Sequence, residues 1–279
     1  MAAGVKGCKR QSSLRNSIST YAVVGASRGI GLELVHQLSS NRDNVVYAIV
    51  RKKATATHLT NNLVSTLPTG NVHIFEADVA DHRALEAVAK QVTQIGGGAF
   101  DVLIHNAARM EGVNLFRGLM EYEDEDTSYK VNVLGVIPSV NAFLPLLRRG
   151  TMKKVVIIGS EGGNRDFVWK MRVSSVAAYG TTKAAEAMVA MKYAALLEYE
   201  GFTVVTLSPG VVDVSAIAVD NPTRDDAAKE IIAGLVARLR QTVPDFRTLT
   251  PEESVKRLLA TIESTGPAKT GSFQSVMQS

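Results

Sequence analysis

The stretch Tyr21-Ala-Val-Val-Gly25-Ala-Ser-Arg-Gly29-Ile-Gly31 joins a short apolar run to three glycines, and a helical pattern begins within it. The apolar run has the length and composition of a buried strand. Glycines at a strand-to-helix turn let the backbone adopt positive φ and approach a phosphate closely, while the free N–H groups of the helix bind the negative charge. A tight turn needed only for packing would not require three glycines at this spacing. The stretch therefore predicts the first βα unit of an α/β fold, with a phosphate-binding loop.

The rest of the chain repeats this alternation of strand-length apolar runs and helical periods. Further strands are expected at 45–50, 72–76, 101–105, 154–158, 203–207 and 272–276. Helices are expected between and after them, at 81–96 with Asp81 as N-cap, 127–149, 174–200, 227–241 and 251–265. Strands that alternate with helices form a parallel sheet covered on both faces. The sequence therefore predicts one doubly wound α/β domain over residues 20–279, after a flexible basic tail at 1–19.

Composition narrows the class of protein. The chain has 279 residues, of which 46% are hydrophobic, so it can bury a full core. The net charge of +4 is spread along the sequence without a Lys/Arg block, and nucleic acid is not an expected partner. The single cysteine, Cys8, cannot form an internal disulfide, and we expect no metal site and no membrane span. A cytoplasmic location is expected, although the tail also resembles a transit peptide in composition.

A second stretch, Tyr179-Gly-Thr-Thr-Lys183, places a phenol and an ammonium on one face of a predicted helix. A cation at about 4 Å stabilises a phenolate by at most about 4 kcal/mol at an effective dielectric near 20, which can lower a phenol's pKa by up to about three units. A tyrosine in such surroundings can donate a proton to a carbonyl oxygen or take it back. The same spacing occurs by chance on solvated helix faces, so the pair alone does not identify a catalytic site.

Six motifs follow one another in the order of the predicted elements. They are the glycine loop, Asn106-Ala107-Ala108, Asn132 in Val-Asn-Val-Leu-Gly, Ser160 after the fifth strand, Tyr179 with Lys183, and Pro209-Gly210 after the sixth strand. In this arrangement residues 20–215 resemble the short-chain dehydrogenase/reductase family. The resemblance implies an NAD(P)-dependent oxidoreductase with a single-domain, Rossmann-like doubly wound parallel sheet.

The resemblance implies catalytic roles for four residues. Ser160 would hold the substrate oxygen, and Tyr179 would donate the proton. Lys183 would bind the nicotinamide ribose and lower the pKa of the phenol, and Asn132 would hold a water in a proton relay. Alternatively, Asn132 is a mid-helix residue that bonds a backbone carbonyl or is merely solvated. Because the gap between Ser160 and Tyr179 is longer than usual in the family, the serines at 174–175 are alternatives to Ser160.

Cofactor contacts are expected at the carboxyl ends of the strands. In this type of fold an acid after the second strand binds the ribose 2′-hydroxyl, whereas a basic residue accommodates a 2′-phosphate. Arg51 occupies that place and Arg28 lies in the glycine loop, so we expect NADP (NADPH) as the cofactor. Asp78 would contact the adenine or else cap the strand end. The expected cofactor contacts are Gly25, Ser27, Arg28, Gly29, Ile30, Gly31, Arg51, Asp78, Val79, Asn106, Ala107, Tyr179, Lys183, Pro209, Gly210 and Val212.

Three positions depart from the family pattern. Val24 stands where the family usually has Thr, and His105-Asn-Ala-Ala replaces Asn-Asn-Ala-Gly. Val214 occupies the position of a usual Thr, with Ser215 one step later. The last departure leaves open how the nicotinamide carboxamide is held, for which Val212 or backbone groups are candidates. We interpret His105 as structural.

The expected activity is that of a ketoreductase or carbonyl reductase, which transfers a hydride between NADPH and a ketone or secondary alcohol. The stretches 161–178 and 211–247 are expected to form the substrate site at the carboxyl edge of the sheet. Their apolar residues, which favour a bulky and mostly apolar small molecule, are Phe167, Trp169, Met171, Val211, Val212, Val214 and Ile217. Alternatively, these side chains pack the two stretches on each other or form a subunit contact.

Two further expectations concern partners and competing functions. The long helices at 127–149 and 174–200 resemble those that pair across a two-fold axis in the family, and both carry apolar residues on more than one face. A homodimer or homotetramer is therefore expected. The alternative to a reductase is the same fold used for a redox-neutral reaction, such as that of a dehydratase, isomerase or cyclase, or as a cofactor-binding regulator.

Overall fold

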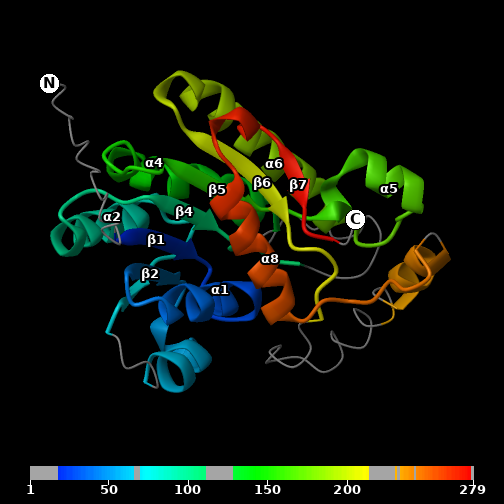
Figure 1. Ribbon diagram of the computed structural model, residues 1–279, viewed down its shortest axis with the longest axis horizontal. Coiled ribbons are helices and arrows are strands. Elements are labelled where there is room, and N and C mark those ends of the chain that lie inside the picture. Colours follow the sequence, from blue (N-terminus) through cyan, green and yellow to red (C-terminus); the bar gives the residue numbers. More distant parts are fainter. Residues whose placement is uncertain are drawn as a thin grey trace, which may run out of the picture.

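A seven-stranded parallel sheet forms the centre of the computed structural model, which describes residues 18–65, 70–110, 128–213, 230, 233–241 and 243–277 (Figure 1). The strands are β1 (Ser19–Val24), β2 (Asn44–Val50), β3 (Val72–Glu76), β4 (Val102–His105), β5 (Lys154–Ile158), β6 (Thr203–Ser208) and β7 (Phe273–Ser275). Their order in the sheet is β3-β2-β1-β4-β5-β6-β7. The order reverses direction between β1 and β4, which is where ligands bind in open α/β sheets. The predicted doubly wound fold is confirmed.

The register of the strands brings their carboxyl ends to one edge. Val24 at the end of β1 is level with Ile49 of β2 and with His105 at the end of β4. Strands β2, β5 and β6 are rich in β-branched residues and buried along almost their whole length, and β1 is buried in its second half, as expected for a sheet covered on both faces. The segments that leave these strands therefore start side by side at the carboxyl edge.

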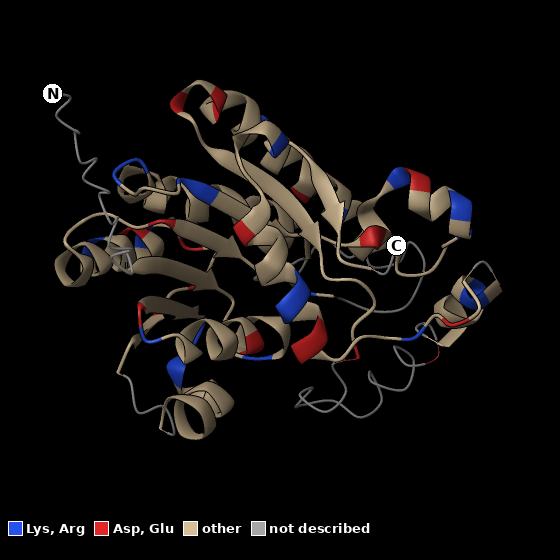
Figure 2. Ribbon diagram, viewed as in Figure 1, with Lys and Arg blue, Asp and Glu red and all other residues tan. Residues whose placement is uncertain are grey.

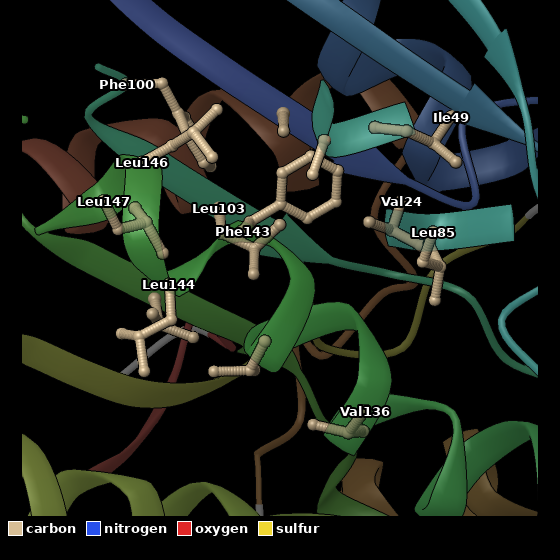
Figure 3. Close-up of a cluster of buried hydrophobic side chains, with 14 of the residues drawn as sticks. Val24, Ile49, Leu85, Phe100, Leu103, Val136, Phe143, Leu144, Leu146 and Leu147 are labelled. Carbon is tan, nitrogen blue, oxygen red and sulfur yellow. The ribbon is translucent and has the colours of Figure 1, made fainter. Parts of the chain in front are cut away.

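Helices cover both faces of the sheet. Helix α1 (Gly29–Ser40) and helix α8 (Pro251–Ser264) lie side by side on one face (Figure 1). The other face carries α2 (His82–Gly96), α4 (Val136–Leu147) and α6 (Ala177–Leu197). Successive strand residues point to opposite faces, so Val23 packs under α1 and α8 while Val24 packs under α2 and α4. The buried side chains around Val24 form the main hydrophobic cluster of the domain. Figure 3 shows part of this cluster, with Leu85 of α2 near Val24.

The ends of the helices follow the expected local rules. Asp81 caps α2 by accepting hydrogen bonds from the backbone N–H groups of Arg83 and Ala84, and Gly97 ends this helix in the left-handed conformation. Helix α8 begins with a capping box between Thr250 and Glu253. The predicted helix at 227–241 is helical wherever it is described, at residues 230 and 233–241.

Two predicted segments differ in detail from the structure. The expected helix at 127–149 contains a π-helical segment, η3 (Lys130–Leu134), before α4. The segment after Ser160, expected to be irregular, forms the short helices η4 (Glu161–Gly163) and α5 (Arg165–Met171). The remaining short helices are η1 (Lys53–Thr55), η2 (His58–Val64), η5 (Glu198–Glu200) and η7 (Pro267–Lys269). Cys8, Val214, Ser215 and Ile217 lie outside the described residues.

One apolar run inside the helix expected at 127–149 reaches the length of a membrane span, although no such run was expected. Lys130–Leu147 is long and apolar enough, by length and composition, to cross a membrane. More than half of this run is buried inside the domain, where Val136, Phe143 and Leu147 belong to the main hydrophobic cluster. Burial against the sheet therefore accounts for its apolar composition.

Candidate functional site

The predicted site residues gather at the carboxyl edge because most of them directly follow a strand. The glycine loop, with Ser27 and Ile30, connects β1 to α1, and Arg51 follows β2. Asp78 and Val79 lie just beyond β3, and Asn106 and Ala107 follow β4. Ser160 comes after β5, and Pro209, Gly210 and Val212 come after β6. The parallel topology thus brings together segments that are far apart in the sequence.

The glycine loop leaves the start of α1 open. Gly25 and Gly29 have φ of +86° and +57°, a region that favours glycine. Arg28 precedes the helix in an extended conformation, and its side chain does not cap the first N–H groups of α1. These N–H groups and the helix dipole form a site suited to an anion such as a pyrophosphate. The loop therefore fits the phosphates of a dinucleotide.

Two of the loop glycines are required by close packing as well. A Cβ atom at Gly25 would lie 2.6 Å from the backbone of Ala107, and one at Gly31 would overlap the carbonyl oxygen of Gly25. Asn106 Nδ2 donates a hydrogen bond of 2.9 Å to the same carbonyl oxygen. The loop is therefore fixed directly against the segment that leaves β4.

The residues after β2 and β3 that were predicted to contact the cofactor differ in exposure and in their contacts with the protein. Arg51 and Arg28 are both exposed. The Asp78 carboxylate accepts a hydrogen bond of 2.9 Å from the backbone N–H of Ala80, so it caps the turn after β3. Val79 is buried and contacts Gly135, where a Cβ atom would lie within 3 Å of its side chain. The structure thus describes a capping role for Asp78, and its contact with the adenine stays a prediction.

Tyr179 and Lys183 share one face of α6, as predicted. Lys183 is buried, and its Nζ donates a hydrogen bond of 2.7 Å to the carbonyl oxygen of Ile158 at the end of β5. The same Nζ lies 5.8 Å from the centre of the Tyr179 ring, which is partly exposed. The lysine is thus anchored to the sheet, next to the phenol.

The charge on Lys183 depends on a residue that the sequence analysis missed. Burial opposes this charge, but the carboxylate of Glu186, 2.7 Å from Nζ, and then Tyr179 act in the opposite direction and raise the pKa of Lys183 above its usual value. Glu186 lies three residues after Lys183, at a spacing that brings side chains together on a helix. The spacing of Lys183 and Glu186 can be read from the sequence. Their complete burial becomes visible only in the structure.

Ser160 is held against α6 by glycines that the sequence analysis also missed. Its Oγ accepts a hydrogen bond of 3.1 Å from the backbone N–H of Gly162 and so caps η4. A Cβ atom at Gly163 would lie 2.6 Å from the backbone of Lys183, and one at Gly180 would lie 2.6 Å from the carbonyl oxygen of Gly162. Only glycines allow η4 and α6 to approach so closely, which places Ser160 beside the helix of Tyr179.

We expect Gly163→Ala to lower the free energy of unfolding by about 1–3 kcal/mol, because the new Cβ atom must push η4 away from the backbone of α6. The matched control is Gly162→Ala, whose Cβ atom would meet only Ser160 Oγ at 3.5 Å, an ordinary contact. Urea denaturation of both variants measures the difference. Equal stabilities would contradict the proposed close packing.

Asn132 lies in the π-helical segment η3 and is fully buried. Its Oδ1 accepts a hydrogen bond of 2.7 Å from the N–H of Arg109, and its Nδ2 donates to the carbonyl oxygen of Arg109 (2.8 Å) and to Thr182 Oγ1 (2.9 Å). Both amide protons are therefore used by the protein, and one lone pair of Oδ1 remains. The side chain links η3 and α6 to the segment after β4, and the backbone carbonyl that it binds lies outside its own helix. The role of Asn132 in a proton relay stays a prediction.

The segment after β6 is tied to the C-terminal part of the chain. Ser254 Oγ donates a hydrogen bond of 2.8 Å to the carbonyl oxygen of Pro209, and Gly210 has a φ of +79°. Val212 forms an isolated parallel bridge with Leu249. These contacts fix the backbone of the segment that, according to the family resemblance, holds the nicotinamide.

The two stretches expected to bind the substrate pack on each other. Met171 of α5 is buried together with Leu239 and Phe246, and Phe167 and Val211 pack against them. Trp169 instead is 71% exposed, with the Arg172 guanidinium 3.8 Å above its ring. The packing alternative therefore holds for Phe167, Met171 and Val211, while Trp169 remains accessible at the surface.

Comparison with known proteins places these features in a family. A family model described as short chain dehydrogenase matches residues 19–225. The short-chain dehydrogenase/reductase atnB of Arthrinium sp is 37% identical over 257 residues, covering 88% of this chain and 92% of the relative. The short-chain dehydrogenase/reductase AacuF of Aspergillus aculeatus is 38% identical over 254 residues, with the same coverage of 88% and 92%.

Solved structures with the same fold include two nicotinamide complexes. The NADPH-bound carbonyl reductase from chicken fatty liver superimposes with a TM-score of 0.70 at 22% identity, covering 93% of this chain and 96% of that one. A short chain dehydrogenase from Burkholderia cenocepacia in complex with NADP gives a TM-score of 0.72 at 21% identity, covering 94% and 98%. At these identities the likeness concerns the fold.

Proposed function

This chain belongs to the short-chain dehydrogenase/reductase family, and from that premise we propose that it is an NADPH-dependent carbonyl reductase. The family makes it an oxidoreductase that uses a nicotinamide cofactor and acts on a small molecule. The finer proposal is that its substrate is a ketone or secondary alcohol of a bulky, mostly apolar compound. The observation that carries it is the anchoring of Lys183 to Ile158 beside Tyr179, with Ser160 on the adjoining turn.

The residues at the carboxyl edge fit such a cofactor. The open N-terminus of α1 and the glycines at 25, 29 and 31 would hold its phosphates, Arg28 and Arg51 the ribose 2′-phosphate, and Lys183 the nicotinamide ribose. When bound, NADPH supplies the hydride that reduces the carbonyl carbon. The NADPH and NADP complexes of the solved relatives support the choice of cofactor.

The protein's own residues would handle the oxygen and the proton. Ser160 donates a hydrogen bond to the carbonyl oxygen of the substrate and orients it. Tyr179 donates its phenolic proton to the same oxygen, and the Lys183 ammonium stabilises the phenolate that remains. Asn132 has a supporting role, because it connects η3 to Thr182 of the catalytic helix. In the direction of alcohol oxidation each transfer runs in reverse.

The test is whether purified protein oxidises NADPH in the presence of aryl and alicyclic ketones. We expect the near-ultraviolet absorbance of the reduced nicotinamide to fall with at least one ketone, and an alcohol of matching structure to appear. Binding of NADPH without oxidation by any member of the panel would favour a redox-neutral reaction or a regulator. Mass spectrometry of the products distinguishes these outcomes.

We further propose that the protein is a homodimer or homotetramer that pairs through α4 and α6. Exposed apolar side chains lie along these helices and the preceding η3, including Leu134, Ile137, Met188 and Met191, each at least 36% exposed. Leu134 and Ile137 also line a hollow of about 440 Å³ between α4 and the start of α2.

We expect light scattering at micromolar concentration to give at least twice the chain mass of 29.9 kDa. The double variant Met188→Glu/Met191→Glu should reduce the mass to that of one chain, because it places charges on the apolar face. The control Ile95→Glu, at the exposed end of α2, should leave the assembly intact. A monomeric wild-type protein would contradict the proposal.

A further inference from the structure

A fully buried ion pair lies on α6, one turn beyond Tyr179. Lys183 Nζ is 2.7 Å from Glu186 Oε2, and the two side chains are 2% and 0% exposed. Among the described residues, Glu186 Oε1 has no hydrogen-bond partner. Most charged residues lie on helices and loops, and the central strands are almost free of them (Figure 2). A buried carboxylate at this place therefore needs an explanation.

Packing alone does not explain Glu186. Taking a carboxylate out of water is costly, and an apolar side chain of similar volume would fill the same space without that cost. Burial raises the pKa of Glu186 to about 7, while the Lys183 ammonium opposes this effect. A carboxyl group is therefore kept in the interior at the expense of stability, 2.7 Å from a cation that the proposed reaction uses.

The other charged groups around α6 do not replace Glu186. His105 at the end of β4 is fully buried, and burial followed by the nearby Lys183 ammonium lowers its pKa to about 3, so it is neutral. Lys154 of β5 binds the carbonyl oxygens of Ile262 and Glu263, and β6 and α4 carry no charged side chain. The remaining charges on packed elements are Glu161 and Lys130, which are partly exposed, and Glu198 and Glu200, which are exposed in η5.

We propose that Glu186 is a positioning residue for the reaction, whose carboxylate keeps Lys183 charged in the dry interior and holds its ammonium between the end of β5 and Tyr179. The proposal rests on the proposed function, in which Lys183 binds the cofactor and stabilises the phenolate. Without the carboxylate, burial is no longer offset and lowers the pKa of Lys183. Above that lowered pKa, Lys183 becomes neutral and Tyr179 loses its cation.

The first test measures the charge on Lys183 and does not depend on activity. NMR of the protein with lysine labelled at the ε-carbon follows each lysine through a pH titration, and the missing signal in Lys183→Ala assigns that residue. In Glu186→Gln we expect Lys183 to titrate at least about two pH units below its wild-type value. The control Glu198→Gln, which removes an exposed carboxylate beyond the end of the same helix, should titrate as wild type. Equal values for Lys183 in wild type and Glu186→Gln would overturn the proposal.

The second test concerns catalysis. We expect the ratio of kcat/KM for alcohol oxidation, Glu186→Gln over wild type, to fall about tenfold between about pH 8 and about pH 10, where wild-type Glu186 is already ionised and Lys183 loses its proton in the variant only. A merely structural role would lower the ratio by the same factor at every pH, and that result would overturn the proposal. If the pKa of Lys183 is shifted in Glu186→Gln but the kcat/KM ratio does not change with pH, the role of Lys183 in the proposed function is refuted. Its charge would then not matter to the reaction.

A conservative variant keeps the proposal testable if the Gln variant does not fold. Glu186→Asp retains the charge one methylene further from Nζ, so Lys183 should titrate between the wild-type and usual values, and the kcat/KM ratio should change less than about threefold with pH. In the wild-type protein itself, Lys183 should remain protonated to at least about pH 10. Deprotonation well below that pH would show that Glu186 does not hold the charge.

Discussion

Replacing Tyr179 by Phe is expected to lower turnover by about 10²–10⁴-fold while NADPH affinity stays within about threefold of wild type. The ring remains in place beside Lys183, so the cofactor contacts are kept, but the phenolic proton is gone. Single-turnover reduction of a ketone, measured beside the dissociation constant of NADPH, separates the two effects. A Tyr179→Phe enzyme that turns over like wild type would remove the basis for the catalytic assignment.

Lys183→Ala should differ from Tyr179→Phe because Lys183 has two roles in the proposed mechanism. We expect both turnover and NADPH affinity to fall, since the variant loses a cofactor contact together with the cation beside the phenol. It also leaves the Glu186 carboxyl buried without its partner, where it is expected to become protonated. Unchanged NADPH affinity in this variant would contradict the ribose contact, and circular dichroism controls for loss of folding.

The strands and the glycine loop could be predicted because their signals are local. The strand at 72–76 and the strand at 154–158 have the predicted bounds, since a short apolar or β-branched run between polar turns needs no tertiary information. The same holds for Asp81, whose capping depends on the residues that follow it. The parallel topology then determined that the segments after the strands would lie at one edge.

The features that the sequence did not reveal depend on contacts between distant segments. Gly163 is needed only because η4 lies against the backbone of α6, and a glycine pair by itself does not indicate such a contact. Phe167 and Met171 are apolar in a segment expected to bind the substrate, but they pack against residues some 70 positions later in the chain, including Leu239. Local composition cannot distinguish a side chain that lines a ligand site from one that packs loops together.

Two arginines are expected to set the choice between NADPH and NADH. Arg51 follows β2, at the place where an acid would favour the 2′-hydroxyl of NADH, and Arg28 lies at the start of α1 in the glycine loop. A charged hydrogen bond contributes about 1.5–3 kcal/mol, or roughly ten- to a hundredfold in affinity. Both arginine side chains are exposed. Because solvent screens exposed charges, we expect the contribution of each arginine to NADPH binding to lie near the lower end of this range.

Wild-type protein should therefore bind NADPH at least about tenfold more tightly than NADH, and Arg28→Ala/Arg51→Ala should lose most of that preference. NADH affinity should change little in the double variant, because NADH has no 2′-phosphate for the arginines to bind. The control Lys90→Ala/Lys192→Ala removes the same charge from exposed positions on α2 and α6, and it should keep the preference. Because the arginines act through charge, added salt should narrow the preference in wild type and not in the arginine variant. Equal dissociation constants for the two cofactors in wild type, or an unchanged preference in the arginine variant, would show that other groups select the cofactor.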